Sequence, residues 1–492
     1  MLDRSSWVGA ELSGANLSGA QLGDANFSGA FFGPANFSGA WLVGANFSGV
    51  NLVEANLAAW CCTASRAARS TGTCGSPIRG PLNRGEGTMN ETTKVFGEHD
   101  EKTLEQFHDV ASRSVRAALM ADGHFGYVMP IGGVAAYRNQ VSPIGVGVDI
   151  ACGNAAIRTD LMYEDVLDHL PVYADEIAGT IAFGPGQTNP SEDAPKDDPL
   201  FEDGAWTVVP RSHRGNLIGK ARAQLGTTGG GNHYVDVFAD EEDRIWVGVH
   251  FGSRGLGFKL AHSFVALAQG LEWDDRPDMN SEVLLDLDTP LGADYWTAMS
   301  LAGQYAYAGR EWVARKVVEI LGGTEQELVH NHHNFAWKEV HFAEELVVVR
   351  KGATPAEPGQ KGFVGGSMGD DSVILRGAFT GAFRHPEQEA SLYSTVHGAG
   401  RVMGRIEAKG KWKKGRLVRP GKIDHEMMDE WMDGKGVELR GGDLDEAPQA
   451  YRRLDDVLAA QGDTVEILHT LRPLIVCMAP SRTSRPAQEE GQ

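Results

Sequence analysis

A five-residue repeat runs from residue 10 to residue 57 and limits the conformation of this stretch more than any other feature of the 492-residue sequence. The unit Ala-Asn-Leu-Ser-Gly occurs at residues 15–19, and Ala-Asn-Phe-Ser-Gly occurs at 25–29, 35–39 and 45–49. A Leu or Phe stands at the same phase of ten successive units, from Leu12 to Leu57. One apolar side chain per unit can therefore stack on the next along the interior of a solenoid.

This repeat resembles a pentapeptide-repeat β-helix, which is a short right-handed solenoid. Ten units make only about two or three coils, and such units need stacked neighbours to bury their faces. Residues 58–88 are rich in Ala, Ser, Thr, Gly and Arg without periodicity, so we expect a linker or a disordered segment there. Met89 opens a sequence of ordinary globular character, and one hypothesis is that the natural protein starts at Met89.

The composition favours a soluble, cytoplasmic, globular protein without a membrane span. The sequence has no run of about 18 or more apolar residues and no secretory leader. Its five cysteines do not form a disulfide framework. The formal net charge of −21 argues against nucleic-acid adhesion by bulk charge alone. One local basic cluster is either a solvated hairpin tip or a strip that faces RNA: Lys409, Lys411, Lys413, Lys414, Arg416, Arg419 and Lys422.

Residues 89–480 predict a single α+β domain, followed by a disordered tail at 481–492. Apolar residues at roughly helical spacing predict an amphipathic helix from 103 to about 121. Strand-like runs at 245–250, 346–349 and 373–375 alternate with helical ones at 295–321 and 449–460. Neither a G-x-G-x-x-G after a strand nor a G-x-x-x-x-G-K-[ST] is present, which excludes the common nucleotide-binding folds.

Five motifs carry a histidine or cysteine beside glycines or polar turn residues, which is typical of a site for a metal and a nucleotide. In the first, glycines around Asp149 and Cys152 allow a tight bend that aims carboxylate and thiol at one ion, although a buried cysteine is also common as a small apolar residue. The five motifs are 147–153 (GVDIACG), 229–233 (GGGNH), 249–255 (VHFGSRG), 331–334 (NHHN) and 396–401 (VHGAGR).

Three of the motifs supply further candidate metal ligands. His233 precedes a strand-like run at 234–238 and His250 ends the next one, so a hairpin could bring both imidazoles within reach of a metal. Each histidine alone is more often a core or surface residue, but the pair favours a ligand role. In the tract that contains His330, His332 and His333, we choose His333 as the ligand, with His332 second, and expect His330 to be exposed.

Two glycine-rich loops and His397 suit phosphate chemistry. Lys351 and Ser367 supply an ammonium, a hydroxyl and nearby backbone amides, which suit phosphate oxygens, although both segments could be ordinary turns. His397 stands four residues before Arg401, so it could be a covalent phosphoryl or nucleotidyl acceptor with an arginine to hold the phosphate. A metal ligand or a structural histidine are the alternatives for His397.

Taken in order, these motifs resemble the RtcB family of GTP- and manganese-dependent RNA ligases. The agreement begins at Asp122-Gly-His-Phe-Gly-Tyr127, continues through 130–135 and the motifs above, and ends near 471–473. The resemblance implies an RtcB-like fold and a GMP–His397 intermediate, with Asp122 near that nucleophile. It also implies one or two Mn²⁺ ions on Asp149, Cys152, His233, His250 and His333. The residues that it implies around GTP are Asn232, Asp236, Lys351, Ser367, Gly398, Ala399, Gly400 and Arg401.

Three departures from the family pattern bear on function. Asp236 stands where the family usually has Glu, and the chain reads Cys477-Met-Ala-Pro480 where typical members end in a lysine-glycine that reaches the nucleotide. The repeat is the third departure, and its partner is unknown. We therefore expect a ligase that joins RNA 3′-phosphate or 2′,3′-cyclic phosphate ends to 5′-hydroxyl ends, with an archease-like activator as a further partner. The alternatives are a guanylyl-capping enzyme, a metal-dependent phosphodiesterase, and a non-catalytic scaffold that presents the repeat.

Overall fold

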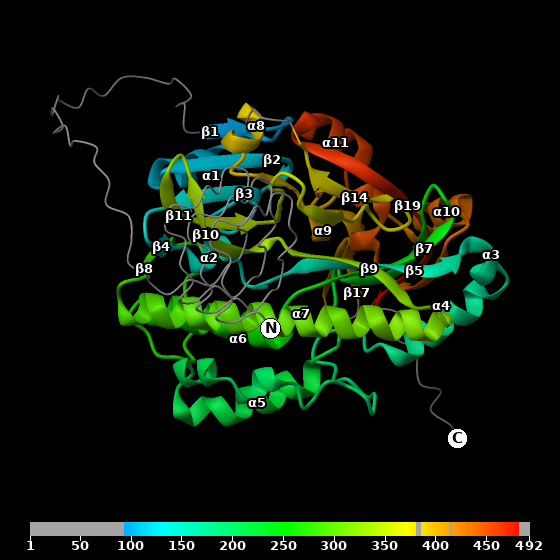
Figure 1. Ribbon diagram of the computed structural model, residues 1–492, viewed down its shortest axis with the longest axis horizontal. Coiled ribbons are helices and arrows are strands. Elements are labelled where there is room, and N and C mark those ends of the chain that lie inside the picture. The colour runs from blue at the N-terminus through cyan, green and yellow to red at the C-terminus, as the bar shows by residue number, and fades with distance from the viewer. Residues whose placement is uncertain (1–92, 380–384, 414–415, 482–492) are drawn as a thin grey trace, which may run out of the picture. The chain divides into compact units, whose positions relative to one another are not determined.

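The computed structural model describes residues 93–379, 385–413 and 416–481, all within one unit of the chain, Thr88–Gln492 (Figure 1). The predicted β-helix at 10–57, the predicted linker at 58–88 and all but the first residue of the predicted tail lie outside the described residues. In the described part, helices and strands follow one another without a regular βαβ repeat, which confirms the α+β prediction.

The larger of two main sheets has eight strands, in the order β13-β14-β19-β6-β7-β5-β9, with β18 also paired to β19. The long strand β19 pairs with β14 along its first half and with β6 along its second. β5, β6 and β7 are antiparallel neighbours. The strands are β5 (Gly153–Met162), β6 (Tyr234–Ala239), β7 (Arg244–Phe251), β9 (Glu325–His332), β13 (Lys361–Val364), β14 (Ser372–Gly377), β18 (Glu438–Gly442) and β19 (Val465–Pro480).

Because side chains alternate along each strand, this sheet has one apolar face and one face that carries candidate site residues. Val235, Val247 and Val249 are fully buried against helices α4 (Leu170–Thr180) and α7 (Pro290–Leu321). Residues of the other parity, among them Asp236 and His250, point to the opposite face because successive side chains in a strand alternate. Figure 1 shows α7 running along one side of the sheet. The face that carries Asp236 and His250 is therefore the one turned away from α7.

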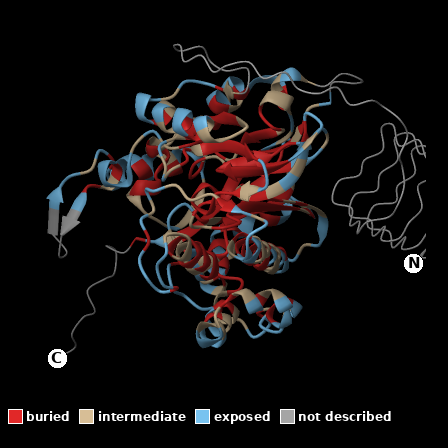
Figure 2. Cartoon of the chain, turned by 90° about the vertical axis from the view of Figure 1, so that its left-hand side faces the viewer, coloured by how far each residue is buried: buried red, intermediate tan, exposed pale blue. Residues whose placement is uncertain are grey.

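The smaller sheet has five strands, in the order β1-β2-β3-β11-β10. One of its faces packs on a core that includes α7 and two further helices, α5 (Arg211–Gln224) and α6 (Arg254–Ala268). The other face packs against β14, β15 (Ser394–Val396) and α11 (Leu454–Gln461). Buried residues therefore lie on both sides of its central strands. Figure 2 shows buried residues in red through the interior of the described part. The strands are β1 (Thr93–Val95), β2 (Arg116–His124), β3 (Ile131–Tyr137), β10 (Asn334–His341) and β11 (Glu344–Lys351).

The helix predicted from 103 to about 121 is wrong in its second half. α1 spans Glu101–Arg113, with the Asp100 side chain accepting from the Thr103 N–H at 3.1 Å as its cap. The chain then continues as β2, which lies between β1 and β3. Residues 117–121 are buried without alternation, and periodicity alone does not distinguish such a strand from a buried helix. The helix predicted at 449–460 likewise begins only at Leu454.

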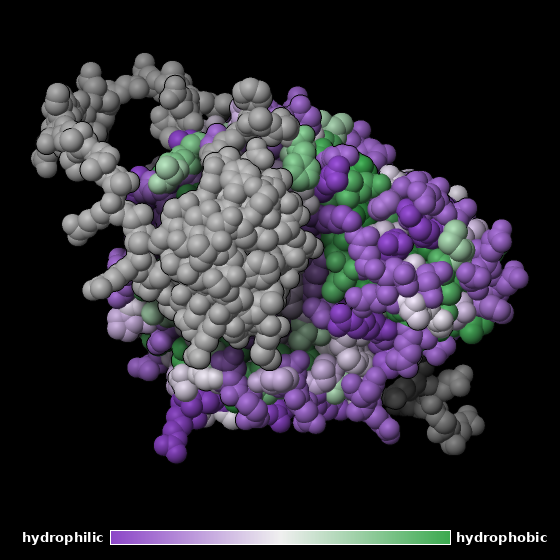
Figure 3. All heavy atoms as spheres, in the orientation of Figure 1, coloured by the Kyte–Doolittle hydropathy of each residue, from purple (hydrophilic) through white to green (hydrophobic). Residues whose placement is uncertain are grey.

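The remaining elements are short or lie at the surface. The basic segment forms an antiparallel pair, β16 (Lys411–Lys413) and β17 (Arg416–Arg419), which is compatible with both alternatives for it, a solvated loop or hairpin tip and a strip that faces RNA. Among the described helices, none combines the length and hydrophobicity that crossing a bilayer requires. On the side in Figure 3, the described surface is mainly hydrophilic. The other elements are α2 (Pro143–Val146), α3 (Tyr163–Val166), α5 (Arg211–Gln224), α6 (Arg254–Ala268), α8 (Pro386–Ala390), α9 (Arg405–Lys409), α10 (His425–Lys435), α11 (Leu454–Gln461), β4 (Gln140–Val141), β8 (Leu285–Asp286), β12 (Ala353–Pro355) and β15 (Ser394–Val396).

Candidate active site

The turn between α2 and β5 carries two of the candidate metal ligands. Gly147 (φ 100°) and Ala151 (φ 61°) have positive φ angles, and the Cys152 N–H donates to the Asp149 carbonyl at 3.0 Å. This tight turn brings the Asp149 carboxylate and the Cys152 thiol to the same side. A Cβ at Gly252 would lie 2.3 Å from Asp149 Oδ1, so only glycine fits directly after β7.

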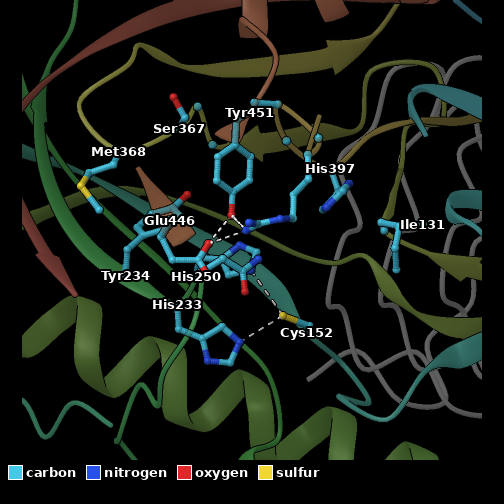
Figure 4. Close-up of a pocket in the computed structure, with 18 of the residues that line it drawn as sticks. Ile131, Cys152, His233, Tyr234, His250, Ser367, Met368, His397, Glu446 and Tyr451 are labelled. Atoms are coloured by element: carbon cyan, nitrogen blue, oxygen red, sulfur yellow. Dashed lines mark hydrogen bonds and ion pairs between the residues drawn. The ribbon is translucent and has the colours of Figure 1, made fainter. Parts of the chain in front are cut away.

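The β6–β7 hairpin brings two histidines to the same thiol. Tyr234 pairs with His250 across the two strands, so His233, directly before β6, lies near His250. Cys152 Sγ lies 3.4 Å from His250 Nε2 and 3.7 Å from His233 Nε2 (Figure 4). His233 Nε2 also lies 3.1 Å from Asp149 Oδ2. The hairpin predicted from the sequence is therefore confirmed.

The Nδ1 atoms of His233 and His250 each lie within hydrogen-bond distance of an oxygen acceptor. His233 Nδ1 lies 2.8 Å from the Thr228 carbonyl, and His250 Nδ1 lies 2.6 Å from Asn154 Oδ1. Asn154 is fixed in turn, because its amide donates to the Phe363 carbonyl at 2.8 Å. Oxygen acceptors require the proton on Nδ1 of both rings. The Nε2 lone pairs of both imidazoles are then free to bind an ion.

His333 completes the group from the end of β9. Its backbone N–H donates to the Cys152 carbonyl at 2.8 Å, and its ring centroid lies 5.0 Å from that of His250. Among the described residues, its buried Nδ1 has no hydrogen-bond partner. Two sets of three ligand atoms result, each within 4.8 Å of one another, and they share the thiol: Cys152, His250 and His333, and Asp149, Cys152 and His233.

These donors fit one or two divalent transition-metal ions. Burial, with a smaller effect from neighbouring imidazoles, lowers the pKa of His250 and of His333 well below the usual value, so both rings are neutral, as a ligand must be. Burial and the Asp149 charge raise the pKa of the Cys152 thiol well above its ordinary value. A bound cation acts in the opposite direction and favours the thiolate.

Arg310, in the middle of α7, donates hydrogen bonds to three separate segments that carry candidate ligands. Its guanidinium is fully buried and donates to the carbonyl oxygens of Ala151 at 2.9 Å and Phe251 at 2.6 Å. It also donates to His332 Nδ1 at 2.8 Å. Each of these three acceptors belongs to a residue next to a candidate ligand: Cys152, His250 and His333.

Neither His330 nor His332 belongs to the two sets of close ligand atoms, and both lie against Arg310. Arg310 Nε donates to His330 Nε2 at 2.8 Å, and the His330 side chain is only 9% exposed. The expectation that His330 is exposed is wrong, because Arg310 and Glu311 of α7 cover it. Nothing in the sequence around Arg310 marks it, since it stands in an ordinary helical stretch far from the glycine-rich motifs.

His397 and Asp122 lie on the other side of the cavity from the thiol. His397 follows β15, and its Nδ1 lies 2.5 Å from Asp122 Oδ2, at ion-pair distance but out of line for a hydrogen bond. The same oxygen accepts from the backbone N–H of His397 at 2.9 Å and of Gly398 at 3.3 Å. The Asp122 residue is completely buried. Because Asp122 faces Nδ1, His397 Nε2 is left for another partner.

A cavity of about 260 Å³ joins these two groups. The His397 and His333 ring centroids are 5.0 Å apart across it, and Figure 4 shows His397, His250 and Cys152 around the same space. Lys351 does not line this cavity. It is buried and donates to the carbonyls of Tyr127 at 2.6 Å and Ile144 at 3.2 Å. The predicted residues that do line it are Asp149, Cys152, Asn232, His233, Asp236, His250, His333, Ser367, His397, Gly398, Ala399, Gly400 and Arg401.

Arg401, from the 396–401 motif, belongs to a cluster at one end of the cavity whose other members the motifs did not indicate. Arg401 donates to Glu446 at 3.0 Å, to the Tyr451 hydroxyl at 2.7 Å and to the Asp445 carbonyl at 2.6 Å. Arg405 donates to the carboxylates of both Asp445 and Glu446. Both guanidinium groups are thus already paired within the protein. The acidic partners come from a separate short segment that has no recognisable pattern of its own.

Polar atoms without protein partners face the same cavity. Among the described residues, Asp236 Oδ1, the Tyr234 hydroxyl and Ser367 Oγ are buried and make no hydrogen bond. Burial raises the pKa of Asp236 well above its usual range, so a neutral carboxyl group is favoured there. Unsatisfied buried groups of this kind are expected where a ligand supplies the missing partners.

Comparison with known proteins agrees with this geometry. The profile of a family described as tRNA-splicing ligase RtcB matches residues 106–479. The chain belongs to the RtcB family. A second profile, for pentapeptide repeats in nine copies, matches residues 12–56. Over 385 residues the chain is 33% identical to RNA-splicing ligase RtcB of Escherichia coli strain K12, covering 73% of this chain and 89% of the relative. The tRNA-splicing ligase RtcB of Archaeoglobus fulgidus is 30% identical, covering 76% and 90%.

Proposed function

We propose that the chain is an RNA ligase that joins 3′-phosphate or 2′,3′-cyclic phosphate ends to 5′-hydroxyl ends through a GMP–histidine intermediate. Family membership supports a ligase, and the names of the relatives support RNA splicing as its setting. The observation that carries the proposal is the position of His397. It lies between a buried carboxylate 2.5 Å from its Nδ1 and a set of metal-type ligands whose nearest ring centroid is 5.0 Å away.

In the first step, His397 Nε2 attacks the α-phosphorus of GTP. A nitrogen–phosphorus bond forms, the bond to the bridging oxygen breaks, and pyrophosphate leaves with the electron pair. Asp122 faces Nδ1, so it would keep the proton there and stabilise the positive charge that the ring gains. The backbone N–H groups of His397 and Gly398, which hold Asp122 Oδ2, keep this pair in register.

In the later steps, RNA replaces histidine on the guanylate. Water first opens a 2′,3′-cyclic phosphate to a 3′-phosphate. An oxygen of that 3′-phosphate attacks the guanylate phosphorus, and the bond to His397 breaks, which restores the free imidazole. The 5′-hydroxyl of the second RNA end then attacks the 3′-phosphorus, and GMP leaves as the phosphodiester forms.

The five candidate ligands would hold one or two Mn²⁺ ions. When bound, such ions neutralise triphosphate charge and stabilise the pyrophosphate leaving group. We assign contacts to the nucleotide to residues that line the cavity: Asn232, Asp236, Ser367, Gly398, Ala399, Gly400 and Arg401. Arg401 would make its contact in competition with its protein partners. Lys351 lies behind a neighbouring loop, so we propose that it acts on the nucleotide only indirectly.

The deciding experiment incubates the protein with Mn²⁺ and GTP labelled at the α-phosphate, and in parallel with ATP labelled in the same way. We expect an acid-labile, base-stable protein adduct with GTP, followed by joining of a 3′-phosphate RNA to a 5′-hydroxyl RNA. An adduct with ATP instead would show that Asp236 and the changed C-terminal segment alter the choice of base. Absence of any adduct would contradict the proposed intermediate.

The rest of the architecture completes the proposal. Residues 10–57 would form the β-helix, with an unknown protein partner, and 58–88 would link it to a catalytic domain at 89–480, with the tail at 481–492. We propose a cytoplasmic location and an archease-like activator. A truncated chain that starts at Met89 and keeps full ligation would show that the repeat does not contribute to the chemistry.

A further inference from the structure

Two aromatic side chains stand exposed in the segment that carries Asp122. Phe125 is 60% exposed and Tyr127 is 56% exposed, although both lie within seven residues of fully buried β2 positions. Exposed large rings are costly to leave in water without a role. The chemistry proposed above uses only Asp122 from this motif and gives the two rings no function.

The backbone under the two rings is fixed at several points. Gln106 of α1 pairs with both polar groups of Gly126, donating to its carbonyl at 2.7 Å and accepting from its N–H at 3.0 Å. Lys351 Nζ donates to the Tyr127 carbonyl at 2.6 Å. Val128 has a positive φ of 54°, which turns the chain back toward β3. The loop is therefore held firmly while its two rings point outward, as a preorganised contact surface would be.

The rings line a groove that continues into the candidate active site. This groove has a volume of about 820 Å³. It shares wall residues with the metal and His397 cavity, so the two spaces meet: His124, Ile131, Asp149, Asn232, Asn334, Arg401 and Arg405. A ligand that reacts at His397 and extends beyond the cavity has this groove, with its two rings, as a neighbouring path.

We propose that Phe125 and Tyr127 form a stacking platform for unpaired bases at an RNA end that reacts in the His397 cavity. This inference rests on the proposed ligase function. Aromatic rings hold single-stranded RNA by stacking on its bases, and the contact tolerates any sequence because every base has a π-face.

The distribution of charge favours binding of RNA by base stacking over binding by ionic contacts to its phosphates alone. The chain carries a formal net charge of −21, and the two arginines at the groove, Arg401 and Arg405, are already paired with Glu446. Apart from the proposed metal ions, the described residues around the groove offer backbone phosphates few free cations, so base stacking is the further source of affinity there.

The test measures binding of two fluorescent single-stranded oligoribonucleotides to the full chain, one with a 3′-phosphate and one with a 5′-hydroxyl end. F125A/Y127A should weaken binding of at least one of them by roughly tenfold per ring, the size of one base–aromatic stacking contact. Tyr127→Phe, which keeps the ring, should bind as the wild type does, whereas Phe125→Leu, which keeps only apolar bulk, should not.

Two controls separate stacking from a general effect. Phe258 on α6 is 54% exposed and lines neither space, so Phe258→Ala should leave RNA binding unchanged. Replacing the terminal bases of the RNA by abasic residues should weaken binding to the wild type as much as F125A/Y127A does, with no further loss on that variant.

The outcomes also distinguish this inference from the ligase proposal. Failure of the wild-type chain to form a GMP adduct would remove the proposed function, whatever the RNA result. If the adduct forms and F125A/Y127A binds both oligonucleotides as the wild type does, the platform alone is overturned. The platform is likewise overturned if the wild-type chain forms the adduct but binds neither oligonucleotide.

Discussion

The two sides of the cavity have opposite electrostatic character. The ligand wall (Asp149, Cys152, His233, His250 and His333) is rich in uncharged donors, because burial keeps the His250 and His333 imidazoles neutral and raises the pKa of Cys152. The charged wall (Arg401, Arg405, Asp445 and Glu446) contains full charges, but its guanidinium groups are already paired with its carboxylates.

This difference shows where the charge for binding a triphosphate must come from. The sequence suggested that Arg401 could hold a phosphate in bidentate fashion, yet in the fold Arg401 is shared among Glu446, Tyr451 and a backbone carbonyl. A phosphate would have to compete with these partners. The ligand wall, by contrast, can bind metal ions that bring two or more positive charges. It is therefore the side that can neutralise the negative charge of the triphosphate.

Removal of the proposed nucleophile should have the largest effect, and it tests whether the ligand wall binds metal independently of His397. His397→Ala should abolish covalent GMP labelling, by at least about a thousandfold, because no other described side chain combines a free imidazole nitrogen with a buried carboxylate partner in this cavity. Mn²⁺ stoichiometry should not change, since the ligand wall is intact. His262→Ala, at a half-buried histidine on α6 that does not line the cavity, is the matched control. Residual GMP labelling of His397→Ala would show that another residue is the nucleophile.

Removing the shared thiol tests the ligand wall next. Cys152 belongs to both ligand sets, so Cys152→Ala should weaken Mn²⁺ binding by roughly a hundredfold and labelling with it. Cys477→Ala is the control, because Cys477 is equally buried but lies in the apolar core on the helix side of the same sheet. Equal metal content in the two variants, measured after equilibrium dialysis, would show that Cys152 is merely a core residue.

The ligand wall could be predicted from the sequence because each ligand lies in a local pattern. Glycines before Cys152 and the strand spacing between His233 and His250 indicated both the residues and the hairpin that joins them. The choice of His333 over His332 stays a prediction, which the fold supports by placing Arg310 against His332 and His333 among the close ligand atoms. Local pattern could not reveal that arginine, because its contacts join the middle of a 32-residue helix to one turn and the ends of two strands, all distant in sequence.

The charged wall and β2 show the limits of the same reasoning. Glu446 and Tyr451 meet Arg401 only through the tertiary fold, across 45 or more residues of sequence. Residues 117–121 looked helical because burial on both faces of a central strand removes the period of two. In both cases the decisive partner lies in another element, which a single-sequence pattern does not contain.

Arg310 allows a sharper test of how the ligand wall is held. Arg310→Gln should lower the free energy of unfolding by roughly 3 kcal/mol, because buried acceptors lose their donor. It should also weaken Co²⁺ binding about tenfold or more and change the thiolate–cobalt absorption band, since Ala151 and Phe251 adjoin two ligands.

Arg350→Gln provides the matched control. Arg350 is equally buried but is paired with Glu339 in the smaller sheet. This variant should lose a similar amount of stability while the cobalt spectrum stays the same. If the two variants give the same spectrum, Arg310 contributes only to general stability.

Lys351 sharpens the comparison through a pH dependence, because burial favours the uncharged form of a lysine just as it keeps the imidazoles of the ligand wall neutral. Burial lowers the pKa of Lys351 to about 7 from an ordinary value of 10.5. Between these two values the folded state has lost the proton while the unfolded state keeps it, so stability rises with pH across this window. Relative to Lys351→Met, the wild type should gain about 1.4 kcal/mol in unfolding free energy per pH unit from pH 7 upward, and the difference should level off below pH 7. Urea unfolding of both proteins at several pH values measures this slope, and a constant difference would mean that Lys351 stays charged beside the carbonyls of Tyr127 and Ile144.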